Sequence, residues 1–202
     1  MKKLTLLLMA TMVLATMSCN DTKKKDTEMD ADTTEETMTE TNDSMDQKMS
    51  NDKKEVSFML EAKSESNASG KVMFQQVNGK VTMEASLSGL EPGTHAIHIH
   101  EKADCTAGDG TSAGGHWNPT FQPHGKWGAS EGYHKGDIGN FEADDNGNGR
   151  ITMTTDQWCI GCGDSNRDVL GKSIIVHQGA DDFTSQPSGA AGARVSCGGI
   201  IQ

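Results

Sequence analysis

The sequence predicts an all-β fold, an antiparallel sandwich or barrel of about eight short strands with two long functional loops. Three observations support this expectation. Short apolar and β-branched stretches alternate with polar residues, most of the 23 glycines follow Gly70 in regular clusters, and helical periodicity is scarce. A length of 202 residues suits one domain with appendages.

The predicted strands follow one another from Glu55 onward. Asn78-Gly79 is a strong signal for a type I′ hairpin turn, and Asp144-Asp145-Asn146-Gly147 indicates a second hairpin. Residues 102–136 show little periodicity, and a loop of that length in a compact domain is usually functional. The expected strands are 56–60, 72–77, 81–85, 94–100, 138–143, 150–155, 173–177 and 193–201.

The predicted strand 94–100, Thr-His-Ala-Ile-His-Ile-His, carries the first functional signal. Residues two apart in a strand face the same side, so His98 and His100 project together with Cβ atoms on the order of 6.6 Å apart. Two imidazoles at that spacing can bind one metal ion at about 2 Å from each ring nitrogen. His95 is out of phase and is expected to make structural hydrogen bonds on the opposite face.

The N-terminal residues 1–19 read as an export signal. A basic start precedes a short apolar run, Leu4 to Met17, which is too short to span a bilayer. Ser18-Cys19 resembles a bacterial lipoprotein cleavage site with Cys19 as the lipidated residue, although Thr16 stands where such signals usually have Leu. Ordinary cleavage that discards Cys19 is the alternative. We therefore expect an exported protein of the periplasm or cell envelope, attached to a bacterial membrane through a lipid anchor.

Residues 20–54 are expected to form a flexible tether. They are rich in Asp, Glu, Thr, Lys and Met and contain no aromatic residue, Gly or Pro, so they cannot bury enough apolar surface to fold. Binding of Cu(I) by the tether methionines is a less favoured alternative. The folded domain is expected over 55–202, where 10 basic and 18 acidic residues give a charge of −8. An acidic domain argues against a nucleic-acid partner and requires a local positive centre for an anionic substrate.

Histidines concentrate in the two long loops and the strands beside them. A group of histidines with an aspartate is the composition of a metal centre. The residues concerned are His98, His100, His116, His124, His134, Asp137 and His177.

These residues lie in motifs that resemble the copper,zinc superoxide dismutase family, and the resemblance extends over roughly 55–202. It implies a Greek-key β-sandwich or barrel and a redox-cycling copper beside a structural zinc, with superoxide as the substrate. The motifs are Ile97-His98-Ile99-His100-Glu101, Ser112-Ala113-Gly114-Gly115-His116-Trp117-Asn118-Pro119, His124, His134-Lys135-Gly136-Asp137-Ile138-Gly139-Asn140, Ile175-Val176-His177 and Gly192-Ala193-Arg194-Val195-Ser196-Cys197-Gly198.

By that resemblance, His116 bridges the two metals as an imidazolate. The implied copper ligands are His98, His100, His116 and His177. The implied zinc ligands are His116, His124, His134 and Asp137. The chemistry agrees, because several imidazoles suit a copper ion that changes oxidation state, and three imidazoles with one carboxylate suit a closed zinc site.

Further residues match the family pattern. Arg194 is expected to bind the anionic substrate, since guanidinium is always charged and offers planar donors. Asp181 is expected to link a copper histidine to a zinc histidine through hydrogen bonds. The resemblance also implies a disulfide between Cys105 and Cys197.

The loop between His177 and Arg194 carries no Lys or Arg, so electrostatic steering of the substrate is expected to be weaker or to be supplied elsewhere.

Cys159 and Cys162 depart from the family pattern. They form either a local disulfide, which we favour, or a redox pair. At the level of function, a non-catalytic copper-storage or copper-delivery lipoprotein and a purely structural envelope protein remain alternatives to the enzyme. The sequence singles out no dimer surface, and a homodimer remains open.

Overall fold

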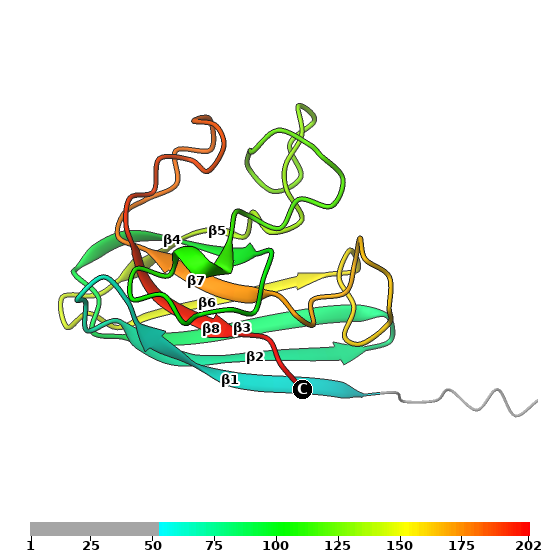
Figure 1. Cartoon of the computed structure of the whole chain (residues 1–202), viewed down its shortest axis with the longest axis horizontal. Coiled ribbons are helices and arrows are strands. Elements are labelled where there is room, and N and C mark those ends of the chain that lie inside the picture. The colour runs from blue at the N-terminus through cyan, green and yellow to red at the C-terminus, as the bar shows by residue number, and fades with distance from the viewer. Residues whose placement is uncertain (1–52) are drawn as a thin grey trace, which may run out of the picture. The chain divides into compact units, whose positions relative to one another are not determined.

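The computed structural model describes residues 53–202. The expected signal segment, Cys19 and the tether methionines lie outside the described residues. Within the described part, eight strands and one short 3-10 helix form the regular structure (Figure 1). The elements are β1 Lys54–Ala62, β2 Ser69–Val77, β3 Lys80–Ser88, β4 Gly93–His100, η1 Thr111–Ala113, β5 Gly139–Ala143, β6 Gly149–Thr155, β7 Ser173–His177 and β8 Arg194–Gly199. No helix among these residues has the length and apolarity needed to cross a membrane.

The strands close into an antiparallel barrel in the order β1-β2-β3-β6-β5-β4-β7-β8. This confirms the predicted all-β class, and of the two predicted architectures the closed barrel is the one found. At the turn between β2 and β3, Asn78 and Gly79 both have positive φ, at 51° and 76°, as the expected type I′ turn requires.

Several predicted strands were too short. The predicted strand 81–85 is β3, Lys80–Ser88, because the ladder with β2 continues to the pair Ser69↔Ser88. At the C-terminus the prediction was too long, since β8 ends at Gly199 and not at Ile201. Cross-strand hydrogen bonds, which single-sequence patterns do not report, set these ends.

Alternation along each strand fills the barrel with apolar side chains. In β3, Val81, Met83, Ala85 and Leu87 are buried while their neighbours are exposed or half-buried. The largest fully buried apolar side chains include Phe74, Ile97, Ile99, Ile174 and Trp158. Fully burying a side chain of this kind stabilises a fold by about 1.5–3 kcal/mol.

β4 is buried on both faces along most of its length. Ile97 and Ile99 face the core, so His98 and His100 face outward and lie beneath the long loops. In Figure 1 the green loop, residues 101–138, and the orange-to-red loop, residues 178–193, extend from the same side of the barrel. β4, which is covered on both faces, therefore positions the first two histidines of the candidate site.

Candidate metal centre

Three histidines come from the ends of neighbouring strands. His98 and His100 lie on β4, and His177 is the last residue of β7, which pairs with β4 through Ile97↔Val176 and His98↔Ile175. The ring centroids of His98 and His177 are 5.0 Å apart, and those of His100 and His177 are 5.7 Å apart. Sheet register therefore brings these imidazoles together.

His116 reaches the same place from the long loop. Its backbone forms an isolated antiparallel bridge with His100, and Trp117 N donates to Ile99 O at 2.8 Å. The His116 ring centroid lies 4.0 Å from that of His98 and 5.0 Å from that of His100. His98, His100, His116 and His177, which we call the four-histidine cluster, each have a ligand-type atom within 4.8 Å of those of the others.

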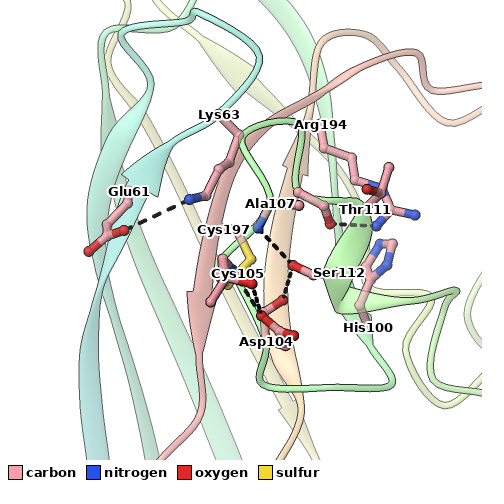
Figure 2. Close-up of a disulfide and its surroundings, with 12 residues drawn as sticks. Glu61, Lys63, His100, Asp104, Cys105, Ala107, Thr111, Ser112, Arg194 and Cys197 are labelled. Carbon is pink, nitrogen blue, oxygen red and sulfur yellow. Dashed lines mark hydrogen bonds and ion pairs between the residues drawn. A yellow bond between two sulfur atoms is a disulfide. The ribbon is translucent and has the colours of Figure 1, made fainter.

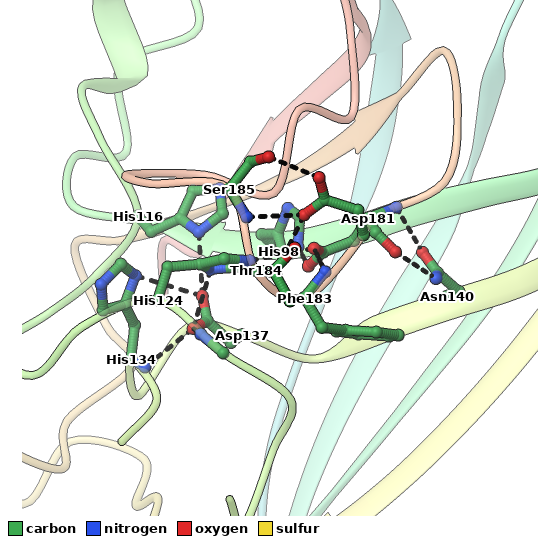
Figure 3. Close-up of polar contacts among 12 residues, drawn as sticks. His98, His116, His124, His134, Asp137, Asn140, Asp181, Phe183, Thr184 and Ser185 are labelled. Carbon is green, nitrogen blue, oxygen red and sulfur yellow. Dashed lines mark hydrogen bonds and ion pairs between the residues drawn. The ribbon is translucent and has the colours of Figure 1, made fainter. Parts of the chain in front are cut away.

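A second group, the mixed cluster, shares His116 and adds His124, His134 and Asp137, again with ligand-type atoms within 4.8 Å of one another. Its members surround one carboxylate (Figure 3). The Nδ1 atoms of His116 and His124 lie 2.9 and 3.0 Å from the Asp137 oxygens, and His134 Nδ1 lies 3.2 Å away. His116 thus belongs to both clusters, and its Nδ1 faces Asp137.

Buried ring nitrogens without hydrogen-bond partners indicate that metals fit here. Among the described residues, eight buried side-chain N and O atoms lack a hydrogen-bond partner, and six of them are ring nitrogens of these histidines. Buried polar atoms are normally paired, so such a concentration calls for an explanation. The atoms are His98 Nδ1, His100 Nε2, His116 Nε2 and His177 Nε2 in the four-histidine cluster, and His124 Nδ1 and His134 Nδ1 in the mixed cluster. Cations with imidazole and carboxylate ligands fit this donor set.

The remaining ring nitrogens of three four-histidine members hold the rings in place. His100 Nδ1 donates to Gly114 O at 2.9 Å, and His177 Nδ1 lies 3.4 Å from Gly192 O. His98 Nε2 donates to Asp181 Oδ2 at 2.9 Å. Such contacts fix the tautomer that leaves the other nitrogen free for a metal.

Asp181 joins the two clusters. Its Oδ2 accepts from His98, and its Oδ1 accepts from His124 Nε2 at 2.9 Å. Asn140 Oδ1 accepts from Asp181 N at 2.8 Å, and Asn140 Nδ2 donates back to Asp181 O at 2.9 Å (Figure 3). Gly189 packs so closely that a Cβ there would lie 1.8 Å from Asp181 Oδ1, and its φ is +70°. The sequence motifs predicted a linking role for Asp181, but gave no role to Asn140 or Gly189.

Burial and charge set the protonation of the site. Burial lowers the pKa of His100 well below its ordinary value, that of His116 to about 4 and that of His177 to about 3. These rings stay neutral at physiological pH, with lone pairs available to a metal. The pKa of His124 is instead raised to about 9. Burial by itself would lower this pKa, but the Asp137 and Asp181 carboxylates favour the charged ring and outweigh the effect of burial. Burial raises the pKa of Asp137, yet the surrounding histidines hold it well below its ordinary value.

A cavity of about 400 Å³ opens beside the four-histidine cluster. Its lining includes His100, His116 and His177, and Arg194 is the only lysine or arginine among the lining residues. The Arg194 side chain is aligned by Gly110 O and Gly114 O, at 2.7 Å from Nη1 and 2.8 Å from Nη2. Asn118 and Ser188 also line this cavity, and the sequence analysis did not single them out.

Two disulfides are present in the described residues. Cys105 pairs with Cys197 and ties the long loop to β8 near Arg194 (Figure 2). Ser112 supports this segment by donating to Asp104 O at 2.9 Å and accepting from Ala107 N at 3.1 Å. Cys159 pairs with Cys162, which is the local disulfide favoured from the sequence.

His95 is buried and does not belong to either cluster. Its ring nitrogens lie 2.8 Å from His177 O and 2.7 Å from Glu91 O, and its ring stacks on Phe141. The expected structural hydrogen bonds are therefore present.

Comparison with known proteins gives the family context. Residues 68–200 match the family model for copper/zinc superoxide dismutase (SODC). The chain is 36% identical over 134 residues to "Superoxide dismutase [Cu-Zn] 2" of Aquifex aeolicus (strain VF5), covering 65% of this chain and 78% of the relative. It is 37% identical over 132 residues to "Superoxide dismutase [Cu-Zn] 1" of the same organism, covering 64% and 78%.

Solved structures show the same similarity. The crystal structure of the clock protein EA4 matches with a TM-score of 0.61 and 34% identity, covering 73% of this chain and 94% of that one. A double mutant of an SOD-like protein from Bacillus subtilis matches with a TM-score of 0.64 and 32% identity, covering 73% and 97%.

Proposed function

The chain belongs to the copper/zinc superoxide dismutase family, and we propose that it protects a bacterial cell envelope from superoxide with the two histidine clusters as its reaction centre. As a superoxide dismutase it uses copper and zinc to convert superoxide to dioxygen and hydrogen peroxide.

Copper is assigned to the four-histidine cluster and zinc to the mixed cluster. One observation carries this assignment: six buried imidazole nitrogens that make no hydrogen bond belong to two groups of residues that share His116. A set of imidazoles without a carboxylate suits a redox-active copper, whereas three imidazoles and Asp137 suit zinc. When bound, copper supplies the one-electron chemistry that takes one superoxide to dioxygen and another to peroxide.

His116 is the proposed proton carrier. Its Nδ1 lies 2.9 Å from Asp137 in the mixed cluster, while its buried Nε2 has no hydrogen-bond partner, and His116 is also a member of the four-histidine cluster. His116 also lines the cavity. The atom Nε2 is therefore where a proton can be held and passed to the reduced product.

Arg194 is the proposed binding group for superoxide. Its guanidinium is fixed by two carbonyl groups and lines the cavity beside His100 and His177. In a domain with a charge of −8, this fixed positive charge attracts the small anion toward the copper side.

The proposed location rests on the N-terminal sequence. A signal over 1–19, lipidation of Cys19 and a tether over 20–54 would hold the enzyme at a membrane in the periplasm or envelope. Mass spectrometry of the membrane-bound protein should find a lipid on residue 19, and Cys19→Ser should release the protein from the membrane. A mature N-terminus beyond residue 19 would contradict the anchor.

Steady-state removal of superoxide by the purified, metal-loaded protein tests the catalytic assignment. Zinc-only protein serves as the control, because it keeps the fold without a redox metal. Rapid removal that depends on copper supports the proposal. Full copper occupancy without turnover would favour the alternative of a copper-storage protein.

A further inference from the structure

The Cys159–Cys162 disulfide lies in a loop that joins β6 to β7 and contributes no residue to either histidine cluster. This loop, residues 156–172, appears in gold at one end of the barrel in Figure 1. The two cysteines differ in environment, because Cys159 is only 4% exposed whereas Cys162 is exposed. Cys162 is therefore the side from which an external thiolate can approach the pair.

The open surroundings of Cys162 favour attack at this residue. Gly161 and Gly163 flank it, and even an added Cβ at Gly163 would meet nothing within 4 Å. By contrast, Cys197 of the other disulfide is fully buried, and Cys105 is half-buried. Access to the sulfur governs exchange rates, so the two disulfides should differ widely in reactivity.

Asp168 holds the Cys162 side of this loop independently of the sulfur–sulfur bond. Its Oδ1 accepts from Gly161 N at 2.9 Å and Leu170 N at 3.1 Å, and its Oδ2 accepts from Gly163 N at 2.8 Å. The backbones of Cys159 and Asp168 also form a parallel bridge. After opening, the two thiols should therefore stay close enough to pair again, while Cys159 and the adjacent Trp158 lose their covalent link to the Cys162 side.

Trp158, immediately before Cys159, connects this loop to the mixed cluster. Its Nε1 donates to Lys135 O at 2.9 Å, and Lys135 follows His134 in the chain. The Trp158 ring is fully buried and packs against Trp127 and Phe74 at centroid distances of 5.4 and 5.9 Å. Gln157 reinforces the contact through Tyr133 Oη and Lys135 Nζ. The segment that bears His134 thus rests on residues adjacent to the disulfide.

We propose that Cys159–Cys162 is a thiol–disulfide exchange site for a dithiol reductant, and that opening it loosens zinc in the mixed cluster through Trp158. The inference rests on the proposed zinc assignment. Zinc binding in the mixed cluster would then depend on the redox state of a disulfide that lies outside both histidine clusters.

The exchange balances as a two-electron reduction. One thiolate of the reductant bonds to Cys162 Sγ, the bond between the cysteine sulfurs breaks, and its electron pair leaves on Cys159 Sγ, which takes a proton from water. The second reductant thiol then loses its proton, bonds to the first reductant sulfur and releases Cys162 as a thiolate, which takes up that proton. The reductant ends as a disulfide and the loop as a dithiol.

Graded reduction of the zinc-loaded protein with dithiothreitol tests selectivity. Iodoacetamide labelling and peptide mass spectrometry should show Cys159 and Cys162 labelled at reductant concentrations that leave Cys105 and Cys197 unlabelled. Opening of Cys105–Cys197 first, or of both disulfides together, would overturn the proposed exchange site.

Zinc transfer to a chromophoric chelator tests the coupling. Opening the disulfide should speed transfer about tenfold, the low end of the effect of losing support around a metal ligand. The double variant Cys159→Ser/Cys162→Ser should transfer zinc at the fast rate without reductant. Trp158→Phe, which keeps an aromatic ring of smaller size and loses the N–H donor, should make transfer insensitive to reduction.

Trp127→Phe is the matched control, because it alters the same aromatic cluster and leaves the bond between Trp158 and Lys135 intact. It should keep the redox-dependent rate. Equal rates for the oxidised and reduced wild-type protein would overturn the coupling. If His134→Ala left zinc affinity unchanged, the zinc assignment itself would fail, and this outcome is distinct from failure of the redox effect.

Discussion

The four-histidine cluster and the mixed cluster share one imidazole but are built in different ways. Three members of the first, His98, His100 and His177, stand on β4 and β7, whose pairing is fixed by the sheet. The second takes His124, His134 and Asp137 from the loop between β4 and β5. Barrel packing therefore positions the first cluster, whereas side-chain and backbone hydrogen bonds position the second.

Contacts around His124 show how the loop is held. Gln186 accepts from His124 N through Oε1 and donates to His124 O through Nε2, both at 2.9 Å. Asp181 binds the ring of the same residue. The mixed cluster should therefore be the more sensitive of the two to changes outside its ligands.

The largest expected effect comes from His177→Ala, which breaks the four-histidine cluster alone. Superoxide removal should fall to background because a copper ligand is lost, while zinc content should remain close to one ion per chain. Activity and elemental analysis of the same sample give the result. Retained turnover would contradict the role of His177 in binding copper.

The next largest effect is expected from acidification, which should remove zinc at a higher pH than copper. The pKa of His124 is about 9, so below that pH zinc must displace a proton and its affinity should fall by about tenfold per pH unit. The pKa values of His116 and His177, about 4 and 3, mean that protons compete for these two copper ligands only in stronger acid. Metal content after dialysis at decreasing pH should show zinc leaving before copper. Earlier loss of copper would reverse the predicted order.

Asp181→Asn should weaken zinc binding by about 10–100-fold, because the variant carries no charge to favour the His124 and His98 tautomers that bind metal. Copper should be less affected, since strand register still holds three of its ligands. Competition with a chelator measures both affinities. Asp145→Asn, in the exposed turn between β5 and β6, is the charge-matched control and should change neither.

The smallest effect that we predict follows from Arg194→Gln, which leaves both clusters intact. The rate of superoxide removal should fall by about tenfold at low ionic strength and become less sensitive to salt, because the fixed positive charge of the cavity is gone. Unchanged metal content is the internal control. A rate equal to wild type at low salt would remove Arg194 from substrate attraction.

The difference between a cluster on strands and a cluster on a loop also explains what the sequence could predict. Alternation along β4 was enough to expect His98 and His100 on one face and His95 on the other. The assignment of the loop residues His124 and His134 required the family motifs, because periodicity carries no information about a long loop.

Other features depend on contacts between distant residues. The close approach of Gly189 to Asp181 and the hydrogen bond from Trp158 to Lys135 appear only when separate loops are folded together. Strand ends such as that of β3 likewise depend on their partners. Local patterns therefore predicted the barrel and its histidine strand better than the supports around the mixed cluster.

Anomalous X-ray diffraction from crystals of the metal-loaded protein, recorded at the copper and zinc absorption edges, tests the central claim most directly. We predict a copper peak beside Nε2 of His116 and a zinc peak beside Nδ1 of the same ring. Metal peaks on only one side of His116, or away from this ring, would contradict a shared two-metal centre.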